Sequence, residues 1–116
     1  MDQYILLLHE CPSSFASIAP EQVQAIIARY KAWGERLREA GRLAGSQKLE
    51  HGTGRMLQNQ NGEVKITDGP FTETKDIVGG YFIIQAQSYD EAAALSSDCP
   101  HLELGGTIEL RRVDQV

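Results

Sequence analysis

Apolar positions follow two different periods along the chain. Tyr4–Leu8 is a continuous apolar run, short enough to predict a strand that is buried on both faces. From Pro20 to Ala40 apolar residues recur at steps of three and four, the pattern of one stripe of an amphipathic helix. Pro20 suits the first helical position and Gly41 the residue just beyond the last. The first forty residues therefore predict a strand followed by a long helix.

The rest of the sequence predicts mostly strands. Asn61-Gly62 is a strong hairpin signal, because both residues tolerate the positive φ that a tight turn requires. Ser88–Glu91 has the pattern of a capping box and predicts the start of a short helix that ends near Ser97. The predicted strands are Arg42–Lys48, Arg55–Gln58, Glu63–Thr67, Gly80–Gln87 and Thr107–Val113.

The order strand, helix, strand, hairpin, strand, helix, strand predicts a ferredoxin-like α+β fold. In this fold a split βαβ unit is repeated, and two helices cover one face of an antiparallel sheet. The β-hairpin is inserted between the second and third core strands, and residues 1–116 form a single domain. The other sheet face also needs cover. We therefore expect a symmetric homodimer that packs sheet to sheet, in a dimeric α/β-barrel-like association.

Charge and composition narrow the classes of partner. The chain has 11 Lys and Arg against 16 Asp and Glu, a net charge of −5 that disfavours nucleic acid as a partner. No apolar run approaches the roughly 20 residues that cross a bilayer. The first residues form a strand pattern rather than a targeting segment. With two cysteines and no export signal, the sequence predicts a cytoplasmic protein with reduced thiols.

The predicted topology gathers polar residues at one edge of the sheet. The first strand ends at the edge where the third core strand begins and where the second helix leads into the last strand. This edge receives His9-Glu10-Cys11, the loop Asp68–Gly79 and Cys99-Pro100-His101. Tyr30 and Trp33, on the first helix, are expected to line the floor of the resulting cleft.

This edge suggests acid–base chemistry. His101 or His9 paired with Asp68 would form a general acid/base, since a carboxylate orients an imidazole and stabilises its charged form. Alternatively, Asp68 caps its own turn by accepting backbone N–H groups. Asp68 and His101 are the candidate catalytic residues. The candidate ligand-binding residues are His9, Trp33, Lys75 and Tyr81, and Lys75 has the alternative of an exposed loop ion pair with Glu73.

Two further chemistries receive little support. His9-x-Cys11 and Cys99-x-His101 offer the ligand types that zinc accepts, but one intervening residue is tighter than the usual structural-zinc spacing. Cys99 lies near a predicted helix C-terminus, whose negative end disfavours a thiolate nucleophile. We predict no metal and no cofactor.

Several motifs together resemble one family. They are the run Thr67–Lys75, which contains Asp68-Gly69-Pro70-Phe71, together with Gly79–Ile84, Cys99–Leu102 and Gly105–Arg111. The chain resembles YCII-related proteins of the DGPF branch over nearly its whole length. The resemblance implies a ferredoxin-like dimer and a small-molecule ligand, and one relative acts as a dechlorinating enzyme on a hydroxylated aromatic.

The resemblance also limits which family site residues can be transferred to this chain, and it suggests a second, non-enzymatic role for the protein. The family's histidine–aspartate pair lies at the first helix, where this chain offers Tyr30 and Glu39 but no histidine, so His101 and Asp68 would have to replace it. DGPF proteins resemble companions of extracytoplasmic-function sigma factors. A non-enzymatic accessory or regulatory partner of such a factor is therefore the alternative to lyase-type or hydrolase-type chemistry.

Overall fold

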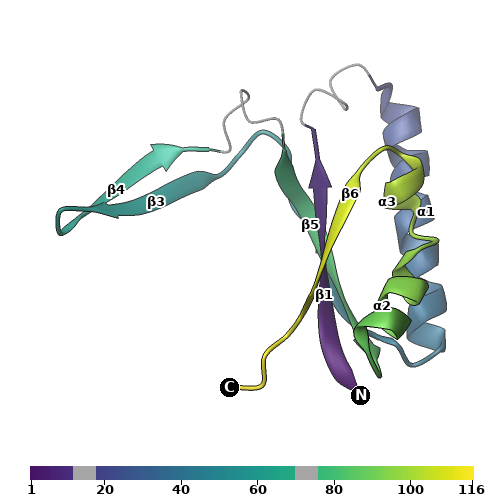
Figure 1. The fold of residues 1–116 in the computed structure, drawn as a ribbon. Helices are drawn as coiled ribbons and strands as arrows, with labels where there is room; N and C mark the ends of the chain where they lie inside the picture. Colours follow the sequence, from purple (N-terminus) through teal and green to yellow (C-terminus); the bar gives the residue numbers. More distant parts are fainter. Residues whose placement is uncertain (12–17, 70–75) are drawn as a thin grey trace.

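The computed structural model describes residues 1–11, 18–69 and 76–116 (Figure 1). The helices are α1 (Pro20–Glu39), α2 (Tyr89–Ser96) and α3 (Pro100–Glu103). The strands are β1 (Asp2–Glu10), β2 (Leu43–Lys48), β3 (Arg55–Gln60), β4 (Glu63–Asp68), β5 (Ile77–Ala86) and β6 (Thr107–Arg112).

The main sheet has four strands in the order β2-β5-β1-β6, and each neighbouring pair is antiparallel. The helices lie on one face of this sheet (Figure 1). This strand order and the one-sided helices confirm the predicted ferredoxin-like α+β fold. Strands β3 and β4 form a separate two-stranded sheet, as the hairpin insertion predicted.

Local sequence signals set the ends of the helices. Pro20 occupies the first turn of α1, and Gly41 follows its end with φ +73°, a conformation that glycine adopts without a Cβ penalty. Ser88 caps α2, since its hydroxyl accepts the Glu91 N–H at 3.2 Å. The short helix α3 was not predicted. It begins at Pro100, and it places His101 against the sheet.

The core lies between the helices and one face of the sheet. Tyr4, Leu6 and Leu8 of β1 are buried, whereas Ile5 and Leu7, which point to the other face, are only half-buried. The prediction that β1 is buried on both faces is therefore wrong for the chain alone. None of the described helices covers the face that carries Ile5 and Leu7 (Figure 1).

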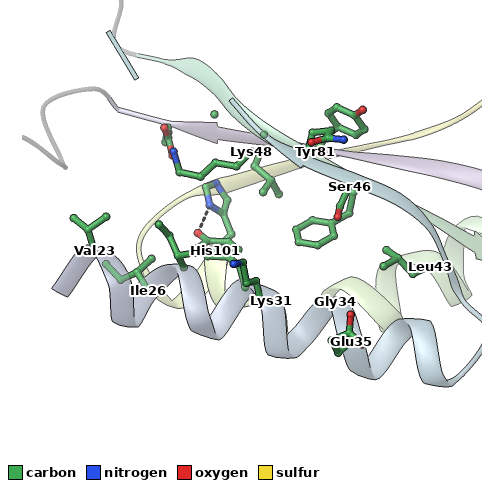
Figure 2. Close-up of a pocket in the computed structure, with 18 of the residues that line it drawn as sticks. Val23, Ile26, Lys31, Gly34, Glu35, Leu43, Ser46, Lys48, Tyr81 and His101 are labelled. Carbon is green, nitrogen blue, oxygen red and sulfur yellow. Dashed lines mark hydrogen bonds between the residues drawn. The ribbon is translucent and has the colours of Figure 1, made fainter. Parts of the chain in front are cut away.

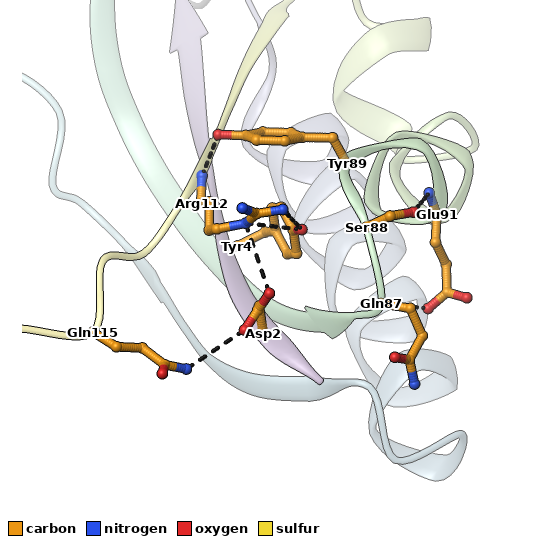
Figure 3. Close-up of polar contacts among 8 residues, drawn as sticks. All are labelled: Asp2, Tyr4, Gln87, Ser88, Tyr89, Glu91, Arg112 and Gln115. Atoms are coloured by element: carbon orange, nitrogen blue, oxygen red, sulfur yellow. Dashed lines mark hydrogen bonds and ion pairs between the residues drawn. The ribbon is translucent and has the colours of Figure 1, made fainter.

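An aromatic and basic cluster fixes the end of the sheet away from His101 (Figure 3). The Arg112 guanidinium donates to the Tyr4 hydroxyl at 3.0 Å and lies 5.5 Å and 5.2 Å from the ring centroids of Tyr4 and Tyr89. The Arg112 backbone N–H donates to the Tyr89 hydroxyl at 2.7 Å. These contacts tie β6 and α2 to the start of β1, and they lie outside the cavity described below.

Across the described ranges, no helix combines the length and the apolar character that a membrane crossing would require.

Candidate functional site

A cavity of about 690 Å³ lies between α1 and the sheet, at the end where β1 finishes (Figure 2). Its apolar wall includes Leu8, Val23, Ile26, Ile27, Leu43 and Phe82. Its polar lining includes Glu10, Tyr30, Lys31, Arg38, Lys48, His51 and His101. An apolar pocket with a few convergent polar groups is the usual form of a small-molecule site.

Glu10 is the most unusual polar group in this cavity. Strand alternation places its side chain on the face of Leu8, and the side chain is only 10% exposed. Within the described part of the chain, its Oε1 is buried without a hydrogen-bond partner, although the His51 Nδ1 lies 3.4 Å away. Burial raises the pKa of the Glu10 carboxyl, and the nearby His51, His101 and Lys48 oppose that rise.

Gly79 allows the Glu10 carboxyl to occupy this position. A Cβ on Gly79 would lie 2.3 Å from the Glu10 Oε1, closer than two non-bonded atoms approach. The β-bulge between Leu8 and His9 opens the ladder at the same level of β1 and β5. The strand ends therefore leave room for a carboxylate, although room alone does not offset the cost of burying it.

His101 is held by two hydrogen bonds. Its Nε2 lies 2.7 Å from the backbone carbonyl of His9, which can only accept, so Nε2 carries a proton. In the neutral ring Nδ1 then accepts the hydroxyl proton of Tyr30, at 2.8 Å (Figure 2). Burial, with Cys99 and Glu10 nearby, raises the pKa of Tyr30 well above its ordinary value. The Tyr30 phenol therefore stays protonated at neutral pH.

The His101 ring occupies space that is open because Gly106 has no side chain. A Cβ at position 106 would lie 2.1 Å from the His101 Nε2, so the Gly106→Ala variant must displace the imidazole. We expect the free energy of unfolding to fall by about 1–3 kcal/mol, the usual cost of overpacking. Chemical denaturation measures this.

Gly45→Ala is the matched control for Gly106→Ala, since nothing lies within 4 Å of the Cβ that it would add. A loss of stability for Gly106→Ala no larger than that of Gly45→Ala would contradict the close packing of His101 against Gly106.

The structure places four of the predicted site residues in different surroundings. His101 lines the cavity, and Tyr81 lines it too, although alternation directs the Tyr81 side chain to the opposite face from Phe82 (Figure 2). Trp33 is a core residue: it is 2% exposed, stacks edge-on against Phe82 and donates from its Nε1 to Asp98 at 2.8 Å. The His9 imidazole contacts Glu109 at 2.8 Å and Asp76 at 3.3 Å, and only its carbonyl reaches His101.

Asp68 does not pair with His101. It ends β4, its side chain is 93% exposed, and its carboxylate lies 3.3 Å from the Arg55 guanidinium. His101 is 2% exposed and both of its ring nitrogens have other partners, so among the described residues of one chain the two side chains do not form the expected pair. Asp68 belongs to the separate hairpin sheet and is not among the residues that line the cavity. Lys75 lies outside the described residues.

Sequence reasoning missed the main role of two cavity residues. Glu10 was placed at the correct edge without a function, although its even spacing from Tyr4, Leu6 and Leu8 indicated that it faces the helices. His51 received no role in the sequence analysis; it is exposed in the connection between β2 and β3, with its Nδ1 3.4 Å from the Glu10 Oε1. Tyr30 was expected on the cleft floor, where it contacts His101.

The structure gives no support to a metal centre or to a reactive thiol. Among the described residues, no three His, Cys, Asp or Glu side chains are placed to share a metal ion. Burial raises the pKa of the Cys99 thiol to about 11, so it stays protonated at neutral pH. The absence of a metal or cofactor stays a prediction.

Comparison with known proteins places the chain in a family. The chain is 29% identical over 96 residues to an uncharacterised protein of Rhizobium meliloti, covering 82% of this chain and 77% of that protein. A solved structure of a 5-chloro-2-hydroxyhydroquinone dehydrochlorinase from Burkholderia phenoliruptrix is 20% identical, with a TM-score of 0.49 over 100% of this chain and 96% of that one. The family model for the YCII-related domain matches residues 3–116. The chain therefore belongs to the YCII-related domain family.

Proposed function

We propose that the protein binds a small molecule in the cavity between α1 and the sheet and carries out proton-transfer chemistry on it. The observation that carries this proposal is Glu10. A carboxylate that is nine-tenths buried, with an oxygen that lacks a hydrogen-bond partner among the described residues, costs stability unless a bound group donates to it. Groups of this kind, with a shifted pKa in a cavity, are concentrated at functional sites.

The cavity lining indicates the chemical class of the ligand. Val23, Ile26 and Phe82 suit an apolar or aromatic body, and Glu10 suits a hydroxyl or another hydrogen-bond donor. Lys31 and Lys48, also in the lining, would attract an anionic group. A small hydroxylated aromatic acid combines these three features.

Each polar residue has a separate role in the proposed proton transfer. Glu10 is the general base, since burial brings its pKa closer to neutrality and its Oε1, which accepts no hydrogen bond from the described residues, accepts a proton. Tyr30 hydrogen-bonds the reacting group, and His101 holds the phenol in position through Nδ1. Abstraction of a proton followed by loss of a leaving group is lyase-type chemistry, and activation of a water by the same base is hydrolase-type chemistry.

A ligand pair tests the assignment of Glu10. We expect para-hydroxybenzoate to bind more tightly than benzoate, because only the former offers a hydroxyl to Glu10. The Glu10→Gln variant should remove most of this preference, since the loss of one charged hydrogen bond costs about 1.5–3 kcal/mol, roughly a tenfold or larger change in affinity. Isothermal titration calorimetry on the full chain measures both ligands.

Glu39→Gln is the control for this test, because Glu39 is exposed on α1 and outside the cavity lining. It should keep the preference for the hydroxylated ligand. An equal preference in the wild type and in Glu10→Gln would contradict the role of Glu10. The absence of binding by either ligand would contradict the proposed ligand class.

Turnover separates the enzymatic role from the accessory one. If a reaction is found in a panel of hydroxylated aromatic acids, Tyr30→Phe should lower kcat by about tenfold, because it removes one hydrogen bond to the reacting group. Capture of a sigma factor together with no turnover would favour the accessory role. The sigma-factor association, the DGPF branch, the homodimer and the cytoplasmic location all stay predictions.

A further inference from the structure

The hairpin formed by β3 and β4, Arg55–Asp68, has one apolar face that is open to solvent. The cross-strand pairs Leu57–Ile66 and Asn59–Val64 place Leu57, Val64 and Ile66 on the same face. This face also carries Asn59 and, where the two strands join the rest of the chain, the ion pair of Arg55 with Asp68. These three side chains are 62%, 60% and 62% exposed. The opposite face carries mainly polar residues, among them Gln58, Gln60, Glu63, Lys65 and Thr67.

Such a hairpin needs a partner. Two strands alone are marginally stable in water and require a third strand or a packed face. This hairpin belongs to a sheet of its own and projects from the end of the main sheet, away from the helices (Figure 1). Its apolar face is thus neither part of the core nor covered by another described element.

We propose that the apolar face of the hairpin packs against a second copy of this chain. The proposal rests on the homodimer stated above and is independent of ligand binding in the cavity. It assigns to the inserted hairpin the role of an arm that reaches across the dimer.

The amount of exposed surface supports a partner of this size. The chain exposes 7944 Å², whereas a compact monomer of 12.8 kDa exposes about 6,300 Å². Its radius of gyration is 16.0 Å, against about 13.4 Å for a compact chain of this length. The excess surface, about 1,600 Å², exceeds the roughly 800 Å² that each partner buries in a standard interface.

The geometry favours a second copy over an unrelated protein. The hairpin leaves the main sheet on the side of the open face, where Ile5, Leu7 and Ile83 are half-buried (Figure 1). A body docked on that face would lie beside the hairpin as well (Figure 1). A twofold-related copy supplies the same two surfaces in return, so a single interface covers all of them.

The charges of the hairpin are compatible with this partner. Arg55 and Lys65 balance Glu63 and Asp68, so the hairpin is neutral although the chain carries a net charge of −5. A neutral arm can approach an acidic second copy without the repulsion that two acidic surfaces would meet.

Paired double variants test the arm. We expect Leu57→Thr/Ile66→Thr to raise the dimer dissociation constant by about tenfold or more, because four apolar side chains per dimer lose buried area. Gln58→Thr/Gln60→Thr, on the opposite face, should change it by less than about threefold. Threonine keeps the strand propensity in both variants. Sedimentation equilibrium measures the constant, and circular dichroism checks the fold.

A dimer of mixed isotope labelling gives a second readout that does not depend on substitution. Nuclear Overhauser effects should connect the methyls of Leu57, Val64 and Ile66 in one copy to protons of the other. A wild type that stays monomeric would overturn both the arm and the homodimer. A dimer that is unchanged by Leu57→Thr/Ile66→Thr, or hairpin methyls that contact only their own chain, would overturn the arm alone.

Discussion

Trp33→Ala is expected to lower the free energy of unfolding by about 3–5 kcal/mol, the usual cost of truncating a buried aromatic residue. Trp33 is almost fully buried, packs edge-on against Phe82 and hydrogen-bonds Asp98. Since a domain of this kind is stable by about 5–15 kcal/mol, the variant should lose a large part of its stability. Chemical denaturation followed by far-UV circular dichroism measures the change.

The Trp33→Phe variant provides the comparison. It keeps much of the packing and loses the hydrogen bond from Nε1 to Asp98, so its loss should be smaller than that of Trp33→Ala. A Trp33→Ala protein that is as stable as the wild type but binds para-hydroxybenzoate more weakly would make Trp33 a ligand-binding residue, as the sequence predicted, and not a core residue.

Glu10→Gln is expected to raise the free energy of unfolding at neutral pH by on the order of 1 kcal/mol, because it replaces a buried charge with a neutral amide of the same shape. Burial raises the pKa of Glu10 in the folded chain above its unfolded value. The folded state then binds more protons between these two values, so the contribution of Glu10 to stability falls as the pH rises through that window. Glutamine is neutral at every pH and does not cause this pH-dependent loss of stability.

The difference in stability between Glu10→Gln and the wild type isolates this effect from other titrating groups. It should be small below the unfolded pKa of glutamate, about 4.3, and should grow to a plateau above the folded value. Denaturation at a series of pH values measures it. A variant that is less stable than the wild type at neutral pH would show that Glu10 serves a structural role.

Most of the fold could be predicted because local signals agreed with the topology. The apolar period of α1, the Asn61-Gly62 turn with φ of 56° and 87°, and the Ser88 cap each specify one element. Element ends differed by a few residues, as for β5, which begins at Ile77 and not at Gly80. These ends depend on ladder pairing with β1, which local sequence does not encode.

The candidate site was predicted only in part. The shared edge correctly brought Glu10 and His101 together, since strand order alone determines which strand ends meet. It failed for Asp68, because the inserted hairpin forms its own sheet and ends outside the cavity. The prediction that Trp33 lines the cleft also failed. On α1 the apolar stripe that packs the core continues into the stripe that lines the cavity, and only tertiary packing separates the two.

The pH titration of the Glu10 side-chain carboxyl, followed by carbon-13 NMR, tests the central claim most directly. The buried carboxyl is predicted to titrate above the ordinary glutamate value of about 4.3, and saturation with para-hydroxybenzoate should shift its midpoint. The Glu10→Gln protein identifies the resonance. A carboxyl that titrates at or below the ordinary value, and does not respond to the ligand, would contradict a binding site organised around Glu10.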